Sequence, residues 1–236
     1  MRFTLETKRR LNIVLAILST SVFSLAACAQ SQLDEANPCG PLSENHYGPF
    51  DYRTATNNQK ALVENAHFRQ KTYTALQGIT GSAGGDINYT LRAFPNHYRA
   101  LDAMRRLAEK ERQDQPSGAM YTIECYYERA IRFRSDDLIV RMLYADFLIR
   151  RTRPENARAQ LDFVASQAGE NPQTHFNVGL LFTDLKIWDR ALEQAHTAIS
   201  LGYMRPDLKD RLQAVGRWVE PPPNVPHHST PAASAP

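Results

Sequence analysis

"LIVRMLYADFLIRRTRPENARAQLDFVASQAGEN", residues 138–171, and "PQTHFNVGLLFTDLKIWDRALEQAHTAISLGYMR", residues 172–205, are both 34 residues long and align without a gap. Small residues recur at the same places, since Ala145 aligns with Gly179 and Ala157 with Ala191. The other apolar residues recur at spacings of three and four, which is typical of helices. Small residues at fixed positions let two antiparallel helices approach closely. The period therefore predicts an all-α fold of repeated helical hairpins.

The spacing resembles the tetratricopeptide repeat, a 34-residue pair of helices. Ala195 and Val164 depart from that pattern, the first being smaller and the second larger than usual. The resemblance implies three repeats, within an array spanning 96–218, and "RQDQPSG" enlarges the turn of the first. "RPDLKDRLQAVGRW" then predicts a cap helix with Leu208, Leu212 and Val215 on one face. The three repeats are residues 98–137, 138–171 and 172–205.

"NPCGP" (37–41) and "GGDINYTLRAFPNH" (84–97) add a second resemblance, to small exported bacterial proteins of this repeat family. It implies that the part of the chain before the array belongs with the repeats.

The first 27 residues are typical of a signal peptide, with the basic start "MRFTLETKRR" and the apolar run "IVLAILSTSVFSLAA". The following "LAAC" resembles a bacterial lipobox, which implies cleavage before Cys28 and lipidation of that cysteine. Ala29 after the cysteine implies the periplasmic face of the outer membrane. The alternative is cleavage after Ala29 at "ACA", which would release a soluble periplasmic protein.

The basic balance of the chain comes from its start. Four of the 28 basic residues and one of the 25 acidic residues lie in the first 28 positions, so the remainder carries equal numbers of each. Nucleic acid is therefore a poor partner for the mature chain, and we expect membrane contact through the lipid anchor alone.

The chain has three cysteines. With Cys28 lipidated, Cys39 and Cys125 form an even pair, which in an oxidising compartment predicts a disulfide. The alternative is a buried thiol at Cys125 and an unpaired one at Cys39.

The remaining segments are less regular. We expect an extended stretch over 28–60, with Tyr47, Phe50 and Tyr52 as apolar anchors, and short helices with a glycine-rich joint over 61–95. One short helix is expected over 68–76, and Asp86 is the expected N-cap of the next. The Pro/Ala-rich tail, 219–236, is expected to be disordered.

Motifs of catalysis are absent from the sequence: there is no HExxH, GxSxG or CxxC. The glycines before Asp86 lack the lysine of a phosphate-binding loop. His97 and His175 stand at helix starts, where packing is the commoner role, and His227 and His228 lie in the tail. We therefore predict no catalytic residue, no metal site and no cofactor.

With no catalytic motif in the sequence, binding of a partner by surface shape is the function that remains. In the tetratricopeptide family the first helix of each unit lines a concave groove, which receives a peptide or a partner's helix. The resemblance implies an interaction scaffold of the bacterial envelope with an unidentified protein or peptide partner. The alternatives are a groove covered by the N-terminal segment, or an envelope enzyme or ligand-binding accessory protein with a site around Asp86, Arg92, His97 and Arg99. The groove residues carried over are Arg99, Asp102, Arg106, Glu109, Ile139, Met142, Asp146, Ile149, Gln173, Phe176, Asn177, Leu180 and Thr183.

Overall fold

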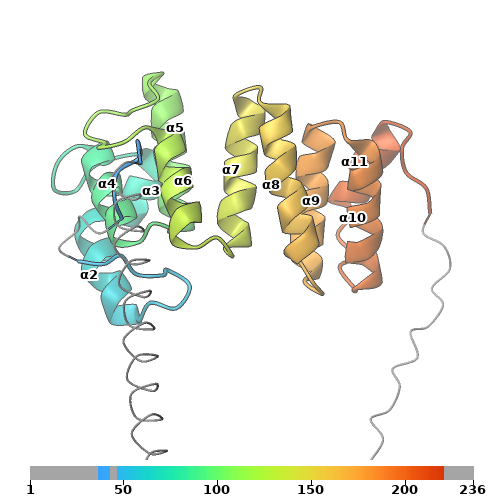
Figure 1. The fold of residues 1–236 in the computed structure, drawn as a ribbon, viewed down its shortest axis with the longest axis horizontal. Helices are drawn as coiled ribbons and strands as arrows, with labels where there is room; N and C mark the ends of the chain where they lie inside the picture. The colour runs from blue at the N-terminus through green and yellow to red at the C-terminus, as the bar shows by residue number, and fades with distance from the viewer. Residues whose placement is uncertain (1–36, 43–46, 221–236) are drawn as a thin grey trace, which may run out of the picture. The chain divides into compact units, whose positions relative to one another are not determined.

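The computed structural model describes residues 37–42 and 47–220. Within these residues the regular structure is helical and contains no strand, so the all-α prediction is confirmed (Figure 1). The described residues divide into two compact units, the first ending at Phe133 and the second beginning at Arg134. No helix among the described residues is long and apolar enough to cross a membrane.

The second unit is a series of antiparallel helices joined by short turns. α7 packs on α8, α8 on α9, and α9 on α10, while α11 packs on both α9 and α10 (Figure 1). α7 and α9 begin 34 residues apart, and so do α8 and α10. The five helices are α7 (Leu138–Arg150), α8 (Pro154–Gln167), α9 (Pro172–Asp184), α10 (Trp188–Ser200) and α11 (Asp207–Ala214).

The helix starts of this unit follow from local sequence. Asp137 accepts hydrogen bonds from the N–H groups of Ile139 and Val140, and Asn171 accepts one from Thr174. A capping oxygen of this kind satisfies amide groups that have no partner within the helix. Pro172 occupies the first turn of α9, where a missing N–H costs nothing. The repeat is therefore encoded in the caps as well as in the apolar pattern.

Small residues set the distances between these helices. Ala145, Ala157 and Ala191 are completely buried. At Gly179 a Cβ atom would lie 2.4 Å from the Cδ2 atom of Leu208, so the glycine lets α11 pack directly on α9.

The cap helix differs in one detail from the sequence prediction. Leu208 and Leu212 are buried, but Val215 is 47% exposed. The expectation for Val215 is wrong because α11 ends at Ala214, before the helix returns that position to the core.

The first unit contains the remaining described helices. α4 packs on α2 and α5, α3 packs on α5, and α5 packs on α6. α2 begins within the stretch expected to be extended, because Thr56 and Gln59 form a reciprocal capping box. The helices are α2 (Asn57–His67), α3 (Gln70–Ala75), α4 (Ala83–Ala93), α5 (Tyr98–Glu111) and α6 (Ile123–Phe133).

Aromatic side chains hold the segment before α2 against this unit. Tyr47, Phe50 and Tyr52 pack on a small buried cluster that includes Val63 and Phe94. The Tyr52 and Phe94 ring centroids are 5.8 Å apart with edge-to-face geometry. The predicted anchors therefore contact α2 and the end of α4.

The glycine-rich stretch leads into α4 and supplies part of its first turn. Ser82 caps α4 by accepting a hydrogen bond from the N–H of Gly85, so the prediction of Asp86 as N-cap is wrong. Gly84 and Gly85 lie inside the first turn of α4. A Cβ atom at Gly84 would lie 2.2 Å from the carbonyl oxygen of Ser117, so this glycine serves close packing on the α5–α6 connection.

Candidate functional site

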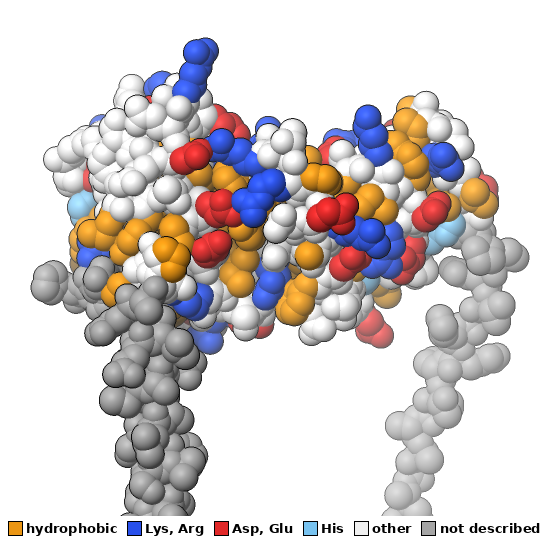
Figure 2. Space-filling model, turned by 45° about the horizontal axis from the view of Figure 1, so that its top comes forward, with side chains coloured by type: hydrophobic (Ala, Val, Ile, Leu, Met, Phe, Trp, Pro, Cys, Tyr) orange, Lys and Arg blue, Asp and Glu red, His pale blue; other side chains and the backbone are white. Residues whose placement is uncertain are grey.

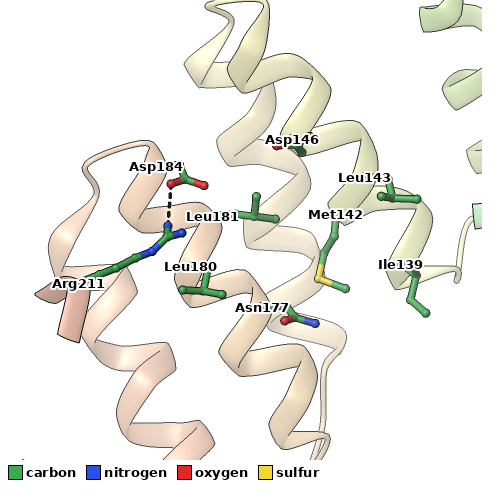
Figure 3. Close-up of a pocket in the computed structure, with 9 residues that line it drawn as sticks. All are labelled: Ile139, Met142, Leu143, Asp146, Asn177, Leu180, Leu181, Asp184 and Arg211. Atoms are coloured by element: carbon green, nitrogen blue, oxygen red, sulfur yellow. Dashed lines mark hydrogen bonds and ion pairs between the residues drawn. The ribbon is translucent and has the colours of Figure 1, made fainter. Parts of the chain in front are cut away.

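The second unit has an open hollow of about 370 Å³ between α7, α9 and α11. Figure 3 shows the side chains of α7 and α9 facing one another across it, with Arg211 reaching in from α11. Its lining is mainly aliphatic, and the polar groups lie among these apolar side chains. The lining residues are Ile139, Met142, Leu143, Asp146, Asn177, Leu180, Leu181, Asp184 and Arg211.

The 34-residue period explains why two helices contribute to one hollow. Leu143 of α7 aligns with Asn177 of α9, and Asp146 aligns with Leu180. α7 and α9 are the first helices of successive helix pairs, so their aligned residues face the same side. Both residues of each aligned couple therefore line the hollow.

The polar side chains of the hollow differ in whether they have a hydrogen-bond or ion-pair partner. Asp184 pairs with Arg211 at 2.9 Å, and Asp146 pairs with Arg150 at 2.9 Å. The carboxamide of Asn177 is half-buried and has no hydrogen-bond partner among the described residues. An amide offers both donors and an acceptor, the groups that a peptide backbone complements. The hollow thus combines an apolar wall with one unused polar group.

Five of the predicted groove residues of the second unit lie in this lining: Ile139, Met142, Asp146, Asn177 and Leu180. Ile139 is 44% exposed.

Four other predicted residues lie outside the lining. Phe176 is only 4% exposed, because Tyr203 covers it with ring centroids 5.0 Å apart. Thr183 is buried, and its hydroxyl donates to the carbonyl of Leu180. Ile149 is half-buried and Gln173 is exposed.

The sequence missed four lining residues: Leu143, Leu181, Asp184 and Arg211. Leu143 and Leu181 each directly follow a predicted groove residue, Met142 and Leu180. Including the next position along the helix would have found both. Arg211 comes from the cap helix, and its position depends on tertiary packing.

The predicted groove residues of the first unit lie on α5 and are engaged within that unit. Arg99 and Arg106 pack on the ring of Tyr73, at 4.3 and 4.7 Å from its centroid. Arg106 also pairs with Asp102, and Arg105 bridges Asp102 and Glu109. Tyr73 belongs to α3, so α3 packs on this face of α5.

Asp86, the centre of the alternative site, is buried and acts as a structural anchor. It accepts hydrogen bonds from the N–H groups of Ile79 and Thr80 and from the Thr80 hydroxyl, and His67 Nδ1 lies 2.9 Å away. Burial raises the pKa of Asp86, but these hydrogen bonds outweigh it and hold the pKa below its usual value. The carboxylate thus fastens the turn before α4.

His97 is likewise used by the fold. Its Nδ1 accepts the N–H of Ala100 and caps α5, so the proton lies on Nε2, which donates to Glu64 at 3.2 Å. Burial lowers the pKa of His97, although Glu64 opposes this effect. Tyr52 stacks on the ring and donates to Glu64, and burial followed by this contact raises the pKa of Tyr52 to about 12. The histidine is neutral and enclosed.

The cysteine pair is joined: Cys39 and Cys125 form a disulfide, as predicted. The Glu128 carboxylate lies beside it, so Cys39, Cys125 and Glu128 bring three potential metal-ligand atoms within 4.8 Å of one another. Cys28, the predicted lipidation site, lies outside the described residues, as do His227 and His228.

Charge is mixed over the face of the molecule that Figure 2 shows. Figure 2 shows Lys and Arg side chains interspersed with Asp and Glu over the visible face. This distribution matches the balanced composition of the chain after its first 28 residues.

Comparison of the chain with family models, with curated proteins and with solved structures found no match.

Proposed function

We propose that this protein is a non-enzymatic interaction scaffold that holds a peptide or a partner's helix in the hollow between α7, α9 and α11. The observation that carries the proposal is the unpartnered Asn177 carboxamide in an open, mainly aliphatic hollow. Apolar walls supply affinity to an amphipathic helix, and a placed amide orients its backbone.

The proposal also includes the repeat type of the fold and the cellular location of the protein. The array is of the tetratricopeptide type, three repeats with a cap helix, and the 34-residue offset of α7 from α9 and of α8 from α10 supports this assignment. The chain is exported, lipidated on Cys28 and held at the periplasmic face of the outer membrane, or soluble in the periplasm if cleaved after Ala29. Its partner is an envelope protein or a peptide segment of one.

The balance of contacts favours the scaffold over an enzyme or ligand-binding protein centred on the first unit. Asp86, His97 and Arg99 are all engaged in contacts that fasten helices to one another. A binding role in the second unit uses Ile139, which is 44% exposed, and the Asn177 carboxamide, which has no partner among the described residues.

The test compares two exposed aliphatic residues of the second unit. Ile139, at the hollow, is 44% exposed, and Val215, outside its lining, is 47% exposed. The tagged chain is cross-linked in envelope fractions, and the captured proteins are identified by mass spectrometry. We expect one specific partner that is lost with Ile139→Asp and Asn177→Ala and retained with Val215→Asp. Equal recovery with all variants would refute binding in this hollow.

A further inference from the structure

The disulfide lies in a cluster that the scaffold role does not use. The short strap of residues 37–42 crosses α6, and Cys39 on the strap is bonded to Cys125 on α6. Glu128 is three residues beyond Cys125, on the same side of the helix, and its Oε2 atom lies 3.1 Å from Cys39 Sγ. A disulfide sulfur carries no proton, so this contact is not a hydrogen bond in the oxidised protein.

Arginines hold the strap independently of the disulfide. The Arg129 guanidinium donates to the carbonyl oxygens of Cys39, Gly40 and Pro41 at 2.8, 3.1 and 2.8 Å. Arg132 donates to the Gly40 carbonyl at 2.5 Å. Arg129 is 2% exposed, so water competes little for these hydrogen bonds. None of these contacts involves a sulfur atom, so we expect them to persist after reduction and to keep the two thiols close together.

Reduction of the cluster is a thiol–disulfide exchange with an external dithiol. Cys125 is half-buried and Cys39 is 3% exposed, so the dithiol's thiolate attacks Cys125 Sγ and Cys39 leaves as a thiolate. The second thiol of the reductant then releases Cys125, and the reductant becomes a disulfide. Two electrons pass to the protein, and the cysteines take up two protons.

We infer that the reduced cluster of Cys39, Cys125 and Glu128 binds a thiophilic divalent cation of the zinc class. Two sulfurs and one carboxylate oxygen are a ligand set that zinc accepts, and a tetrahedral ion with Zn–S bonds of about 2.3 Å needs its sulfurs about 3.8 Å apart. In the disulfide the two sulfurs are bonded to each other and are not thiolates, so reduction must come before metal binding. The cation and the disulfide exclude one another.

The charges of the cluster suit such an ion. Two thiolates and one carboxylate carry three negative charges against the two positive charges of the cation. Arg129 and Arg132, on the strap carbonyls, offset part of the excess and favour the thiolate forms. Three protein ligands leave the fourth position for water. Calcium and magnesium prefer oxygen ligands, so the site selects against them.

The test uses Co²⁺ as a spectroscopic probe with the full-length chain carrying Cys28→Ala, which leaves only these two cysteines. The chain is reduced with a trialkylphosphine, freed of reductant without oxygen, and titrated with Co²⁺. We expect one equivalent to give thiolate-to-cobalt charge-transfer absorption with tetrahedral bands, which one equivalent of Zn²⁺ removes. The oxidised chain gives neither.

Variants separate a metal site from adventitious thiol binding. Glu128→Gln lowers the Co²⁺ affinity at least about tenfold, because even outer-shell partners of metal ligands contribute that much. Glu124→Gln, on the same helix, leaves the affinity unchanged, and Cys125→Ser abolishes the charge-transfer band. The inference is overturned if the reduced chain shows no such band, or if Glu128→Gln binds as tightly as Glu124→Gln. New protease cleavage within 37–42 after reduction also overturns it, since the arginines would then not hold the strap.

Discussion

Replacing Gly84 by alanine tests the packing role of the glycine-rich stretch. In an ordinary helix the change stabilises the protein by up to about 1 kcal/mol. Here the new Cβ atom would lie 2.2 Å from the Ser117 carbonyl oxygen, where ordinary contacts begin at 3.4 Å, so α4 and the connection after α5 must separate by more than an ångström. Overpacking of this kind costs about 1–3 kcal/mol. With the full helix-propensity gain subtracted, we expect a net loss of up to about 2 kcal/mol.

Gly85→Ala is the matched control. It lies in the same turn, and its Cβ atom would meet only the Ser82 hydroxyl at 3.1 Å and the Gly118 carbonyl at 3.9 Å. We expect its unfolding free energy to equal the wild-type value or to exceed it by up to about 1 kcal/mol. Urea unfolding followed by far-ultraviolet circular dichroism measures both variants. Equal stability of Gly84→Ala and Gly85→Ala would refute the packing argument.

Three further predictions concern stability. Because the pKa of Asp86 is lowered, its stabilising effect is complete above its unfolded pKa of about 4 and is lost as the pH falls through the folded value. Acid unfolding should therefore be less steep below that pH in Asp86→Asn. Replacing both Cys39 and Cys125 by serine removes a disulfide between residues separated by 86 positions. We expect the unfolding free energy, measured by urea unfolding, to fall by about 4–5 kcal/mol. Leu208→Ala should cost about 2–5 kcal/mol and lower the thermal midpoint, whereas Val215→Ala should leave it unchanged.

Much of the second unit could be predicted because its information is local and periodic. Ala157 and Ala191 recur at the repeat distance, and so do the caps Asp137 and Asn171. Each residue contributes to the helix pair in which it lies. The 34-residue repeat alignment also identified Met142 and Leu180 as groove residues, and both line the hollow.

What the sequence could not supply depends on contacts between distant segments. Phe176 holds a groove position in the register, but Tyr203 returns after α10 to cover it. Arg211 reaches the hollow only because α11 packs at Gly179. The local sequence around Gly84 does not reveal that the Ser117 carbonyl oxygen, in the α5–α6 connection, leaves no room for a side chain there.

Site-specific photo-cross-linking of the intact chain in growing bacteria tests the central proposal most directly. A photoreactive amino acid replaces Ile139 at the hollow in one strain and Val215 outside its lining in another, two positions of nearly equal exposure. The proposal predicts one discrete protein adduct from position 139, lost when Asn177→Ala is added, and none from position 215. The same adduct from both positions, or none from position 139, would contradict binding of a protein partner in this hollow.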